Sequence, residues 1–394
     1  LGTRVGASPT LHWLRSQRAL EPSGKAQSPR AETRAHTALG QPATPHCSNM
    51  GRRQSLALPL LLLPQLHALS SSTTPRPTRA AAAKPHQQRR LQRRRDDRAA
   101  LVERLREPEP RVLRAPAVDW AALPAHADPA RGGRLKGRRA ARKRVAVEAF
   151  AAVTPALLAD TDASVVVDVG CGAGGLTSPL ASFANARVIG VDVLPEPLRL
   201  LRERSGGAVE TLELDALALA DGKRLRALGA SCVVSLHACG AVSDLAMDGA
   251  VAAGLPFAVS PCCIGKSLLE RGENFRGRMP TSSERSARPP SISYPRSASL
   301  GDRCTATEYA IVASIADYGV GEGDPPDVVA RQRRAKRIVE TDRLGHAAEK
   351  GYDVRLLDMM VDPLYPKREL LLGAPCGSRA AAALAALETV KSPW

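Results

Sequence analysis

Four glycines in one short segment could form a loop that holds a cofactor. Gly170, Gly172 and Gly175 satisfy the pattern Gly-x-Gly-x-x-Gly, and Gly174 adds a further glycine. Glycine lets the backbone turn sharply and approach a ligand closely at the start of a helix. The pattern alone is a weak signal, so the choice of cofactor depends on the residues around it.

Three carboxylates accompany this loop. Asp168 precedes Gly170 by two residues, and Asp192 and Asp215 end the next two apolar segments. A carboxylate beneath the loop would repel a pyrophosphate, but it would attract the sulfonium and ammonium groups of S-adenosylmethionine (SAM). Asp192 could then hold the ribose diol, and Asp215 could accept a hydrogen bond from the adenine amino group. The charges therefore favour SAM over NAD, unless Asp168 only caps the turn and Asp192 only ends a strand.

The residues that we predict to bind the cofactor lie around these positions. They are Asp168, Gly170, Cys171, Gly172, Gly174, Asp192, Val193, Asp215, Ala216 and His237.

Histidine and cysteine follow two later apolar segments, as His237-Ala-Cys239-Gly and Pro261-Cys262-Cys263. They could bind zinc, transfer a proton or pack as small buried side chains. Adjacent cysteines on a strand point to opposite faces, and structural zinc sites usually pair cysteines two to four residues apart, so we name no metal ligand. The ordinary pKa of histidine suits removal of a proton from a methyl acceptor.

We predict a catalytic group at these segments. It comprises His237, Cys239, Asp244, Cys262 and Cys263. Asp244 falls in the first turn of an expected helix, where stabilising the helix dipole is the alternative role.

These residues need an α/β scaffold to bring them together. Apolar segments that read as strands alternate with helical segments from residue 145 onward, which is typical of a parallel sheet. Each candidate residue follows the carboxyl end of a predicted strand, where open α/β sheets bind ligands. The expected strands are 163–169, 187–191, 208–214, 231–236, 256–260, 352–359 and 369–374. The last two are close enough for an antiparallel hairpin, so we predict seven strands in a Rossmann-like, class I methyltransferase fold.

Charge and composition divide the chain into parts. Residues 1–144 carry 29 Lys and Arg against nine Asp and Glu, whereas the remainder has 27 against 30. This difference excludes a uniformly basic coat protein for nucleic acid. We expect an extension over 1–49, a basic targeting or disordered leader over 50–136, a catalytic domain over 137–376 and a tail over 377–394. A Ser-, Arg- and Pro-rich stretch predicts a disordered insert at about 271–302.

The leader resembles two targeting signals in succession. Met50-Gly-Arg-Arg precedes a leucine-rich run that ends near Ala68, as in a signal peptide. Residues 70–90 have no acid and are rich in Ser, Thr, Ala, Pro and Arg, as in a transit peptide. Together they predict a plastid protein delivered through the secretory route, with a cytoplasmic protein as the alternative. No apolar run is long enough for a membrane span, and eight cysteines without regular spacing do not predict a disulfide framework.

Three blocks carry a specific resemblance. VVVDVGCGAGGLTSPLA, the block from SLHACG to PCCIGKS, and VETDRLGHAAEKGYDVRLLDMMVDPLYPKRELLLGAP resemble the methyltransferase domain of the glutathione S-transferase C-terminal domain-containing protein family. That domain is similar to tRNA 2′-O-methyltransferases with Cys-Gly and Cys-Cys motifs. The resemblance covers about residues 143–375, and Ala-Arg-Lys-Arg, residues 141–144, also resembles the opening of the family's domain. It implies SAM-dependent methyl transfer, with tRNA as the nearest precedent for a substrate.

The predicted function is therefore SAM-dependent methylation of an acceptor that could be RNA. Basic segments could contact phosphates at residues 89–95, 131–144 and 331–337, or they could be solvated surface. Lys266 could also neutralise a phosphate. The alternatives are a SAM- or RNA-binding protein without catalysis and an NAD-dependent oxidoreductase. The sequence does not indicate an oligomeric state.

Overall fold

The computed structural model describes residues 85–392, apart from 134, 163, 185, 266–288, 290, 322, 360–364 and 366. The predicted signal and transit segments up to residue 84 and Lys266 lie outside the described residues. All described residues belong to one compact unit, Arg79–Trp394.

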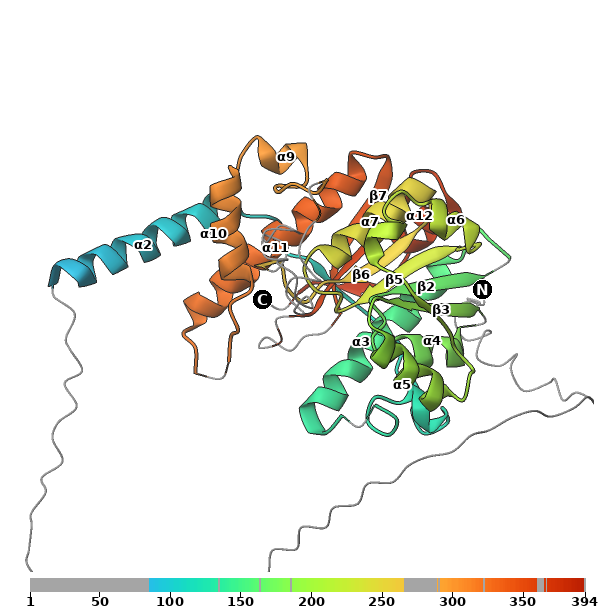
Figure 1. Ribbon diagram of the computed structural model, residues 1–394. Helices are drawn as coiled ribbons and strands as arrows, with labels where there is room; N and C mark the ends of the chain where they lie inside the picture. Colours follow the sequence, from blue (N-terminus) through green and yellow to red (C-terminus); the bar gives the residue numbers. More distant parts are fainter. Residues whose placement is uncertain are drawn as a thin grey trace, which may run out of the picture. The chain divides into compact units, whose positions relative to one another are not determined.

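A central sheet carries the candidate residues (Figure 1). Its seven predicted strands are β2 (Val165–Val169), β3 (Arg187–Asp192), β4 (Glu210–Glu213), β5 (Cys232–Leu236), β6 (Phe257–Ser260), β7 (Tyr352–Asp358) and β8 (Glu369–Pro375). Their order is β4-β3-β2-β5-β6-β8-β7. β2 to β6 pair in parallel, and β8 runs antiparallel to both β6 and β7. The predicted class I methyltransferase fold, with its antiparallel hairpin, is confirmed.

Two short strands extend this sheet beyond the predicted seven. β1 (Arg111–Leu113) pairs in parallel with β7, and β9 (Thr389–Val390) pairs antiparallel with β1. The sheet therefore has nine strands, and the expectation of seven is corrected. Strands of two or three residues are too short for a period-2 pattern to reveal them.

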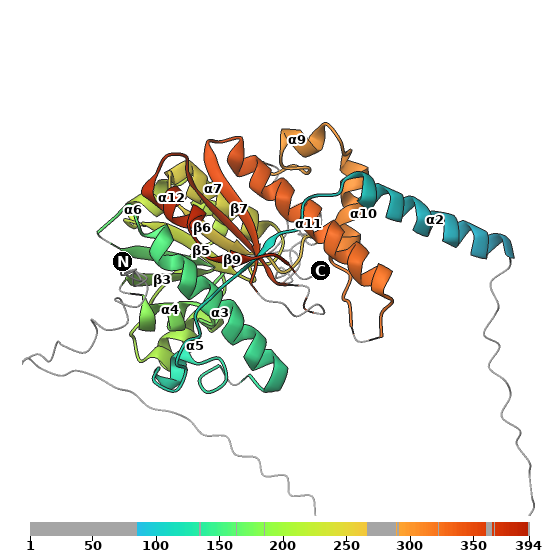
Figure 2. The same cartoon turned by 180° about the vertical axis from the view of Figure 1, so that it is seen from behind.

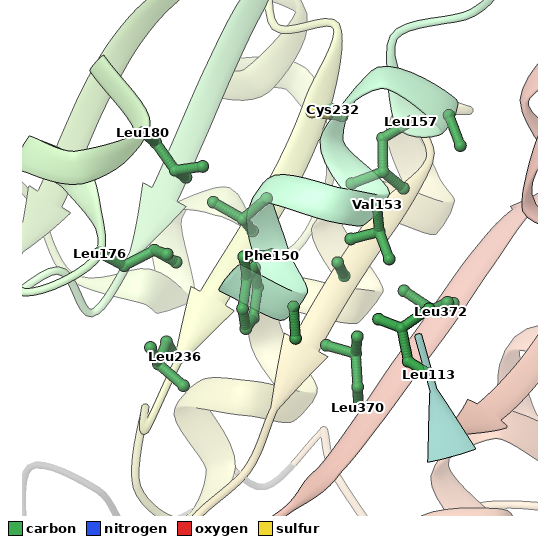
Figure 3. Packing of buried hydrophobic residues seen from close by; sticks show 14 of the residues in the cluster. Leu113, Phe150, Val153, Leu157, Leu176, Leu180, Cys232, Leu236, Leu370 and Leu372 are labelled. Carbon is green, nitrogen blue, oxygen red and sulfur yellow. The ribbon is translucent and has the colours of Figure 1, made fainter. Parts of the chain in front are cut away.

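Helices cover both faces of the sheet. One face packs against α3 (Gly137–Leu157), α4 (Thr177–Phe183) and α12 (Arg379–Ala385), and Phe150 of α3 is fully buried there (Figure 3). The other face packs against α7 (Ala241–Ala253) and the end of α11 (Pro326–Ala348). The remaining α/β connections are α5 (Pro195–Ser205), η3 (Ala216–Leu219) and α6 (Lys223–Ala227). Two apolar layers therefore hold the sheet rigid beneath its carboxyl edge.

A third apolar cluster joins the expected leader to the domain. Leu101, Val102 and Leu105 at the end of α2 (Pro85–Arg104) are buried among side chains of α10 (Ala306–Ala316) and α11 (Figures 1 and 2). Trp120 and η2 (Ala125–Ala127) also pack within the unit. Residues 85–136 are thus part of the folded unit and not only a leader, and α12 and β9 place most of the expected tail there too.

Part of the expected disordered insert is also ordered by specific contacts. After residue 290, the Tyr294 hydroxyl donates to Asp244 at 2.7 Å, and the Arg296 guanidinium donates to Asp248 at 2.6 Å. Residues 298–301 form the short helix α9 (Ala298–Gly301). The prediction of disorder is therefore wrong for residues 291–302, because distant carboxylates on α7 supply the partners of this polar segment.

Candidate active site

The glycine loop between β2 and α4 has the backbone that its sequence predicts. Gly170, Gly172 and Gly174 have φ of +73°, +53° and +80°, in the left-handed region that favours glycine. The amides of Gly170 and Cys171 donate to the Val191 carbonyl at 2.8 and 3.1 Å. These bonds tie the loop to the end of β3, so the loop and Asp192 form one unit.

Asp192 fixes the loop directly. One carboxylate oxygen accepts from the Gly172 amide at 2.9 Å, and the other accepts from the Leu194 amide at 2.9 Å. The side chain is still partly exposed, and each oxygen can accept a second hydrogen bond. Asp192 therefore orders the loop and retains lone pairs for the two hydroxyls of a ribose.

The ends of β3 and β4 add polar and apolar groups beyond Asp192. Asp215 accepts from the Leu217 amide at 2.9 Å and remains partly exposed. Val193 and Leu217 are 40% and 41% exposed, so both offer apolar surface to a ligand. Ala216 is buried beside them. The two adjacent strand ends thus present carboxylates, which can accept hydrogen bonds from a nucleoside, beside apolar surface that can contact its base. Leu217 was missed because one leucine in a short turn has no periodicity.

Asp168 lies deeper than predicted. Its side chain is only 1% exposed, and the Thr177 hydroxyl donates to it at 2.6 Å. Burial raises the pKa of Asp168 to about 7, against the opposing effects of Thr177 and the Lys143 ammonium. The expectation that Asp168 directly contacts a cofactor cation is therefore corrected, because its carboxyl group is enclosed beneath the loop.

Lys143 of α3 is a site residue that the sequence analysis did not single out. A Cβ atom on Gly175 would lie 2.9 Å from Lys143 Cε and 3.3 Å from Nζ, so the lysine lies directly against the loop. Burial lowers the pKa of Lys143 to about 8, although Asp168 opposes this change. The absence of a side chain at Gly175 makes room for this ammonium. Only its place in the Ala-Arg-Lys-Arg segment could have drawn attention to it.

Cys171 does not present its thiol to the loop surface. It is buried with Leu198, Leu201 and Val209, and a Cβ atom on Gly190 would lie 2.9 Å from its sulfur. The prediction that Cys171 binds the cofactor can hold for its backbone but not for its side chain.

His237 ends β5 in a strained conformation. Its φ of +69° is the single left-handed value among the non-glycine residues that the structure describes. Nε2 lies 3.4 Å from the Tyr365 hydroxyl, and Nδ1 is buried with no hydrogen-bond partner. Burial, together with Lys143, Lys367 and Lys336, lowers the pKa of His237 to about 3.

This pKa corrects the expected role of His237 as a proton acceptor. A group that acts as a general base works best with a pKa near the operating pH, and a conjugate acid of pKa about 3 makes a weak base. A neutral imidazole is instead suited to orient a ligand through one hydrogen bond. Tyr365, which was missed in the sequence, helps to fix the ring. Arg142 stacks on the tyrosine at 5.0 Å.

The three predicted cysteines do come together. Cys239 Sγ lies 2.9 Å from Cys262 Sγ, which lies 3.8 Å from Cys263 Sγ. All three side chains are partly buried beside His237, whose carbonyl lies 3.6 Å from Cys262 Sγ. The adjacent strands β5 and β6 therefore gather His237 and the thiols at one edge, as the sequence predicts.

Comparison with known proteins agrees with this geometry. Residues 142–268 match a family described as "Methyltransferase domain". These residues form a methyltransferase domain. The chain is also 26% identical over 261 residues to the glutathione S-transferase C-terminal domain-containing protein of Xenopus laevis, covering 66% of this chain and 38% of that protein. Its Drosophila melanogaster homologue is 30% identical over 142 residues, covering 35% of this chain and 21% of the homologue.

The chain thus spans less than two-fifths of the length of these two relatives. The resemblance expected from the sequence is confirmed, and the match to a methyltransferase domain supports SAM as its cofactor. Among solved structures, Aeropyrum pernix fibrillarin in complex with SAM has 13% identity and a TM-score of 0.30, covering 57% of this chain and 73% of that chain.

The methyltransferase domain does not expose Asp244, which we predicted to be catalytic. The carboxylate is 2% exposed and accepts from Arg343 at 3.1 and 3.0 Å, as well as from Tyr294. Burial raises the pKa of Asp244, but Arg343 and Arg296 outweigh burial and lower it overall. The catalytic prediction is therefore wrong. Asp244 joins α7 to α11 and to the segment after residue 290.

The basic stretch 331–337 differs in part from both expectations. Lys336 is fully buried and pairs with Glu340 at 2.6 Å, and Arg337 is buried and pairs with Glu109, so neither is solvated surface or available to a phosphate. Arg331 and Arg334 are partly exposed, so the two expectations still apply to them. Among the described residues, no helix is both long and apolar enough to cross a membrane.

Proposed function

We propose that this domain transfers the methyl group of SAM to an acceptor held at the carboxyl ends of β5 and β6. The observation that carries the proposal is the joint arrangement of the left-handed glycine loop and Asp192, with Val193 and Leu217 exposed beside Asp215. SAM would supply an electrophilic methyl group on a sulfonium. The chain would align it with the acceptor, which is the main requirement for in-line displacement.

Each part of SAM has a matching group in the domain. The two oxygens of Asp192 suit the ribose diol, and Asp215 suits the adenine amino group. The exposed apolar surfaces of Val193 and Leu217 suit the adenine ring. Lys143, which lies against Gly175, suits the carboxylate of the amino-acid part. Asp168 would keep Lys143 in place from below.

His237 and Tyr365 would orient the acceptor. His237 is neutral at physiological pH, and its Nδ1 is buried without a partner. Burial raises the pKa of Tyr365 to about 12, so its hydroxyl stays protonated and can donate a hydrogen bond. The acceptor would lose its proton to water or to a group that it brings itself, because neither residue is a strong base at neutral pH.

RNA is the acceptor class that we propose. The first half of α2 exposes Arg89, Arg90, Arg93, Arg94 and Arg95, which suits contact with a phosphate backbone. Lys367, whose charge acts on His237, adds positive charge where the acceptor would lie.

Binding and transfer can be tested in one series. Calorimetry with SAM, S-adenosylhomocysteine and NAD should give one site for the first two and none for NAD. Asp192→Asn should lower the affinity for SAM by roughly 10- to 100-fold, because Asp192 makes charge-assisted hydrogen bonds. Asp162 is an exposed residue before β2, at the opposite edge of the sheet, so Asp162→Asn should leave this affinity unchanged. Radiolabelled methyl should then appear in an RNA pool. Binding of SAM without methyl transfer would refute the proposed catalytic activity. Methyl transfer to protein alone would refute RNA as the acceptor.

A further inference from the structure

The cysteine cluster has a geometry that a role in packing does not explain. The three Sγ atoms of Cys239, Cys262 and Cys263 lie within 4.8 Å of one another. A tetrahedral zinc–thiolate centre with bonds of about 2.3 Å places its sulfurs about 3.8 Å apart. Cys262 and Cys263 already have that separation. Cys239 and Cys262, at 2.9 Å, would need to open by about 1 Å.

The end of β6 removes the objection to adjacent cysteine ligands. Two neighbouring side chains point to opposite faces only while a strand continues. β6 ends at Ser260, and Pro261 follows before the cysteine pair, so both thiols can turn to the same side. The left-handed backbone of His237 likewise turns the chain after β5, which brings Cys239 to the pair.

The residues after the pair are fixed in place. The Asp317 carboxylate at the end of α10 accepts from the Ile264 amide at 2.9 Å and also from the Gly265 amide. Cys239 and Cys262 lie 3.7 and 3.6 Å from the same His237 carbonyl. Fixed backbone on both sides reduces the entropy lost when the thiols converge on a ligand.

The charge of the loaded site would be small. A metal ion displaces the thiol protons when it binds, so three thiolates and a divalent cation would carry a net charge of −1.

We propose that Cys239, Cys262 and Cys263 together bind one thiophilic divalent metal ion, of which zinc is the expected example. Three protein ligands leave a fourth position open, which is the pattern of zinc sites that contact a substrate or water. The metal would lie beside His237, at the same sheet edge as the SAM site. The site does not depend on methyl transfer being the reaction, so it can stand or fall separately.

The test uses the full chain, purified with a non-thiol reductant and stripped of metal by a chelator. Zn²⁺ is titrated in competition with a chromophoric chelator, and Co²⁺ serves as a spectroscopic probe. We expect one equivalent of Zn²⁺ and sulfur-to-cobalt charge-transfer absorption. Cys239→Ser, Cys262→Ser and Cys263→Ser should each weaken Zn²⁺ binding by more than about 100-fold, because each removes a ligand. Cys376→Ser, at an exposed cysteine after β8, should bind like the parent.

A second measurement keeps the proposal testable if a serine variant unfolds. In the parent chain, bound Zn²⁺ should protect the three cysteines from alkylation, as read by peptide mass spectrometry, while Cys376 remains reactive. Circular dichroism of each variant shows whether it folds. The proposal is overturned if the parent binds less than about 0.2 equivalent, or if the serine variants bind as tightly as the parent. A Cys239–Cys262 disulfide in place of metal binding would also overturn it. SAM affinity is measured in parallel, so failure of the metal site and of the proposed function can be told apart.

Discussion

Replacement of Lys143 by methionine tests how the glycine loop holds the amino-acid part of SAM. Methionine keeps much of the length of the side chain but removes the ammonium beside Gly175. The surroundings lower the pKa of Lys143 from an ordinary 10.5 to about 8, so holding the charge there costs roughly 3 kcal/mol. A charge-assisted hydrogen bond contributes about 1.5–3 kcal/mol, which corresponds to roughly 10- to 150-fold in affinity.

The assay compares two ligands that differ only in the part concerned. In calorimetry, Lys143→Met should lower the affinity for S-adenosylhomocysteine by roughly 10- to 150-fold. The affinity for 5′-methylthioadenosine, which lacks the amino-acid carboxylate, should be nearly unchanged. Lys223→Met, at an exposed position on α6, should change neither. Affinity of the parent for S-adenosylhomocysteine should also fall as the pH rises above about 8, because Lys143 then loses its charge. Equal losses for both ligands would show that Lys143 only supports the loop, and the assignment would be wrong.

Three further predictions concern stability and the acceptor side. Phe150→Ala should lower the free energy of unfolding by about 3–5 kcal/mol in urea, because it opens a cavity between α3 and the sheet; a loss below 1 kcal/mol would contradict the packing. Burial raises the pKa of Asp168 from an ordinary 3.8 to about 7, so this group's contribution to stability decreases as the pH rises from about 4 to 7. Asp168→Asn should remove that decrease. If the variant keeps the pH dependence of the parent's free energy of unfolding, Asp168 is not its cause. Asparagine tolerates a left-handed backbone, so the free energy of unfolding of His237→Asn should lie within about 1 kcal/mol of that of the parent. The rate of methyl transfer should nevertheless fall at least tenfold. Unchanged transfer would exclude His237 from the site.

The sheet was predictable because its strands carry a strong local signal. Val165–Val169 has four valines and is followed by glycines, and short apolar runs likewise mark β3, β5 and β6. The parts that escaped prediction depend on distant partners. β1 has three residues and is defined by pairing with β7 and β9, and the apolar end of α2 is short beside its arginines. Local composition identifies a basic segment but does not reveal what packs against it.

The sequence predicted where the site residues lie better than it predicted their chemical roles. The glycine loop, Asp192 and the three cysteines lie where parallel strand ends must bring them. Burial decided what could not be predicted: it encloses Asp168 beneath the loop and Asp244 between α7 and α11, and it lowers the pKa of His237. Lys143 reaches the loop from α3, the helix that precedes β2. Spacing along the sequence carries no information about such a contact.

The most direct test of the account is a crystal structure of the protein with S-adenosylhomocysteine. We predict the ribose diol within hydrogen-bond distance of both Asp192 oxygens, adenine between Val193 and Leu217, and the ligand carboxylate at Lys143. Density for the ligand at another edge of the sheet, or a ribose that makes no contact with Asp192 at saturating ligand, would contradict the assignment of the glycine loop as the SAM site.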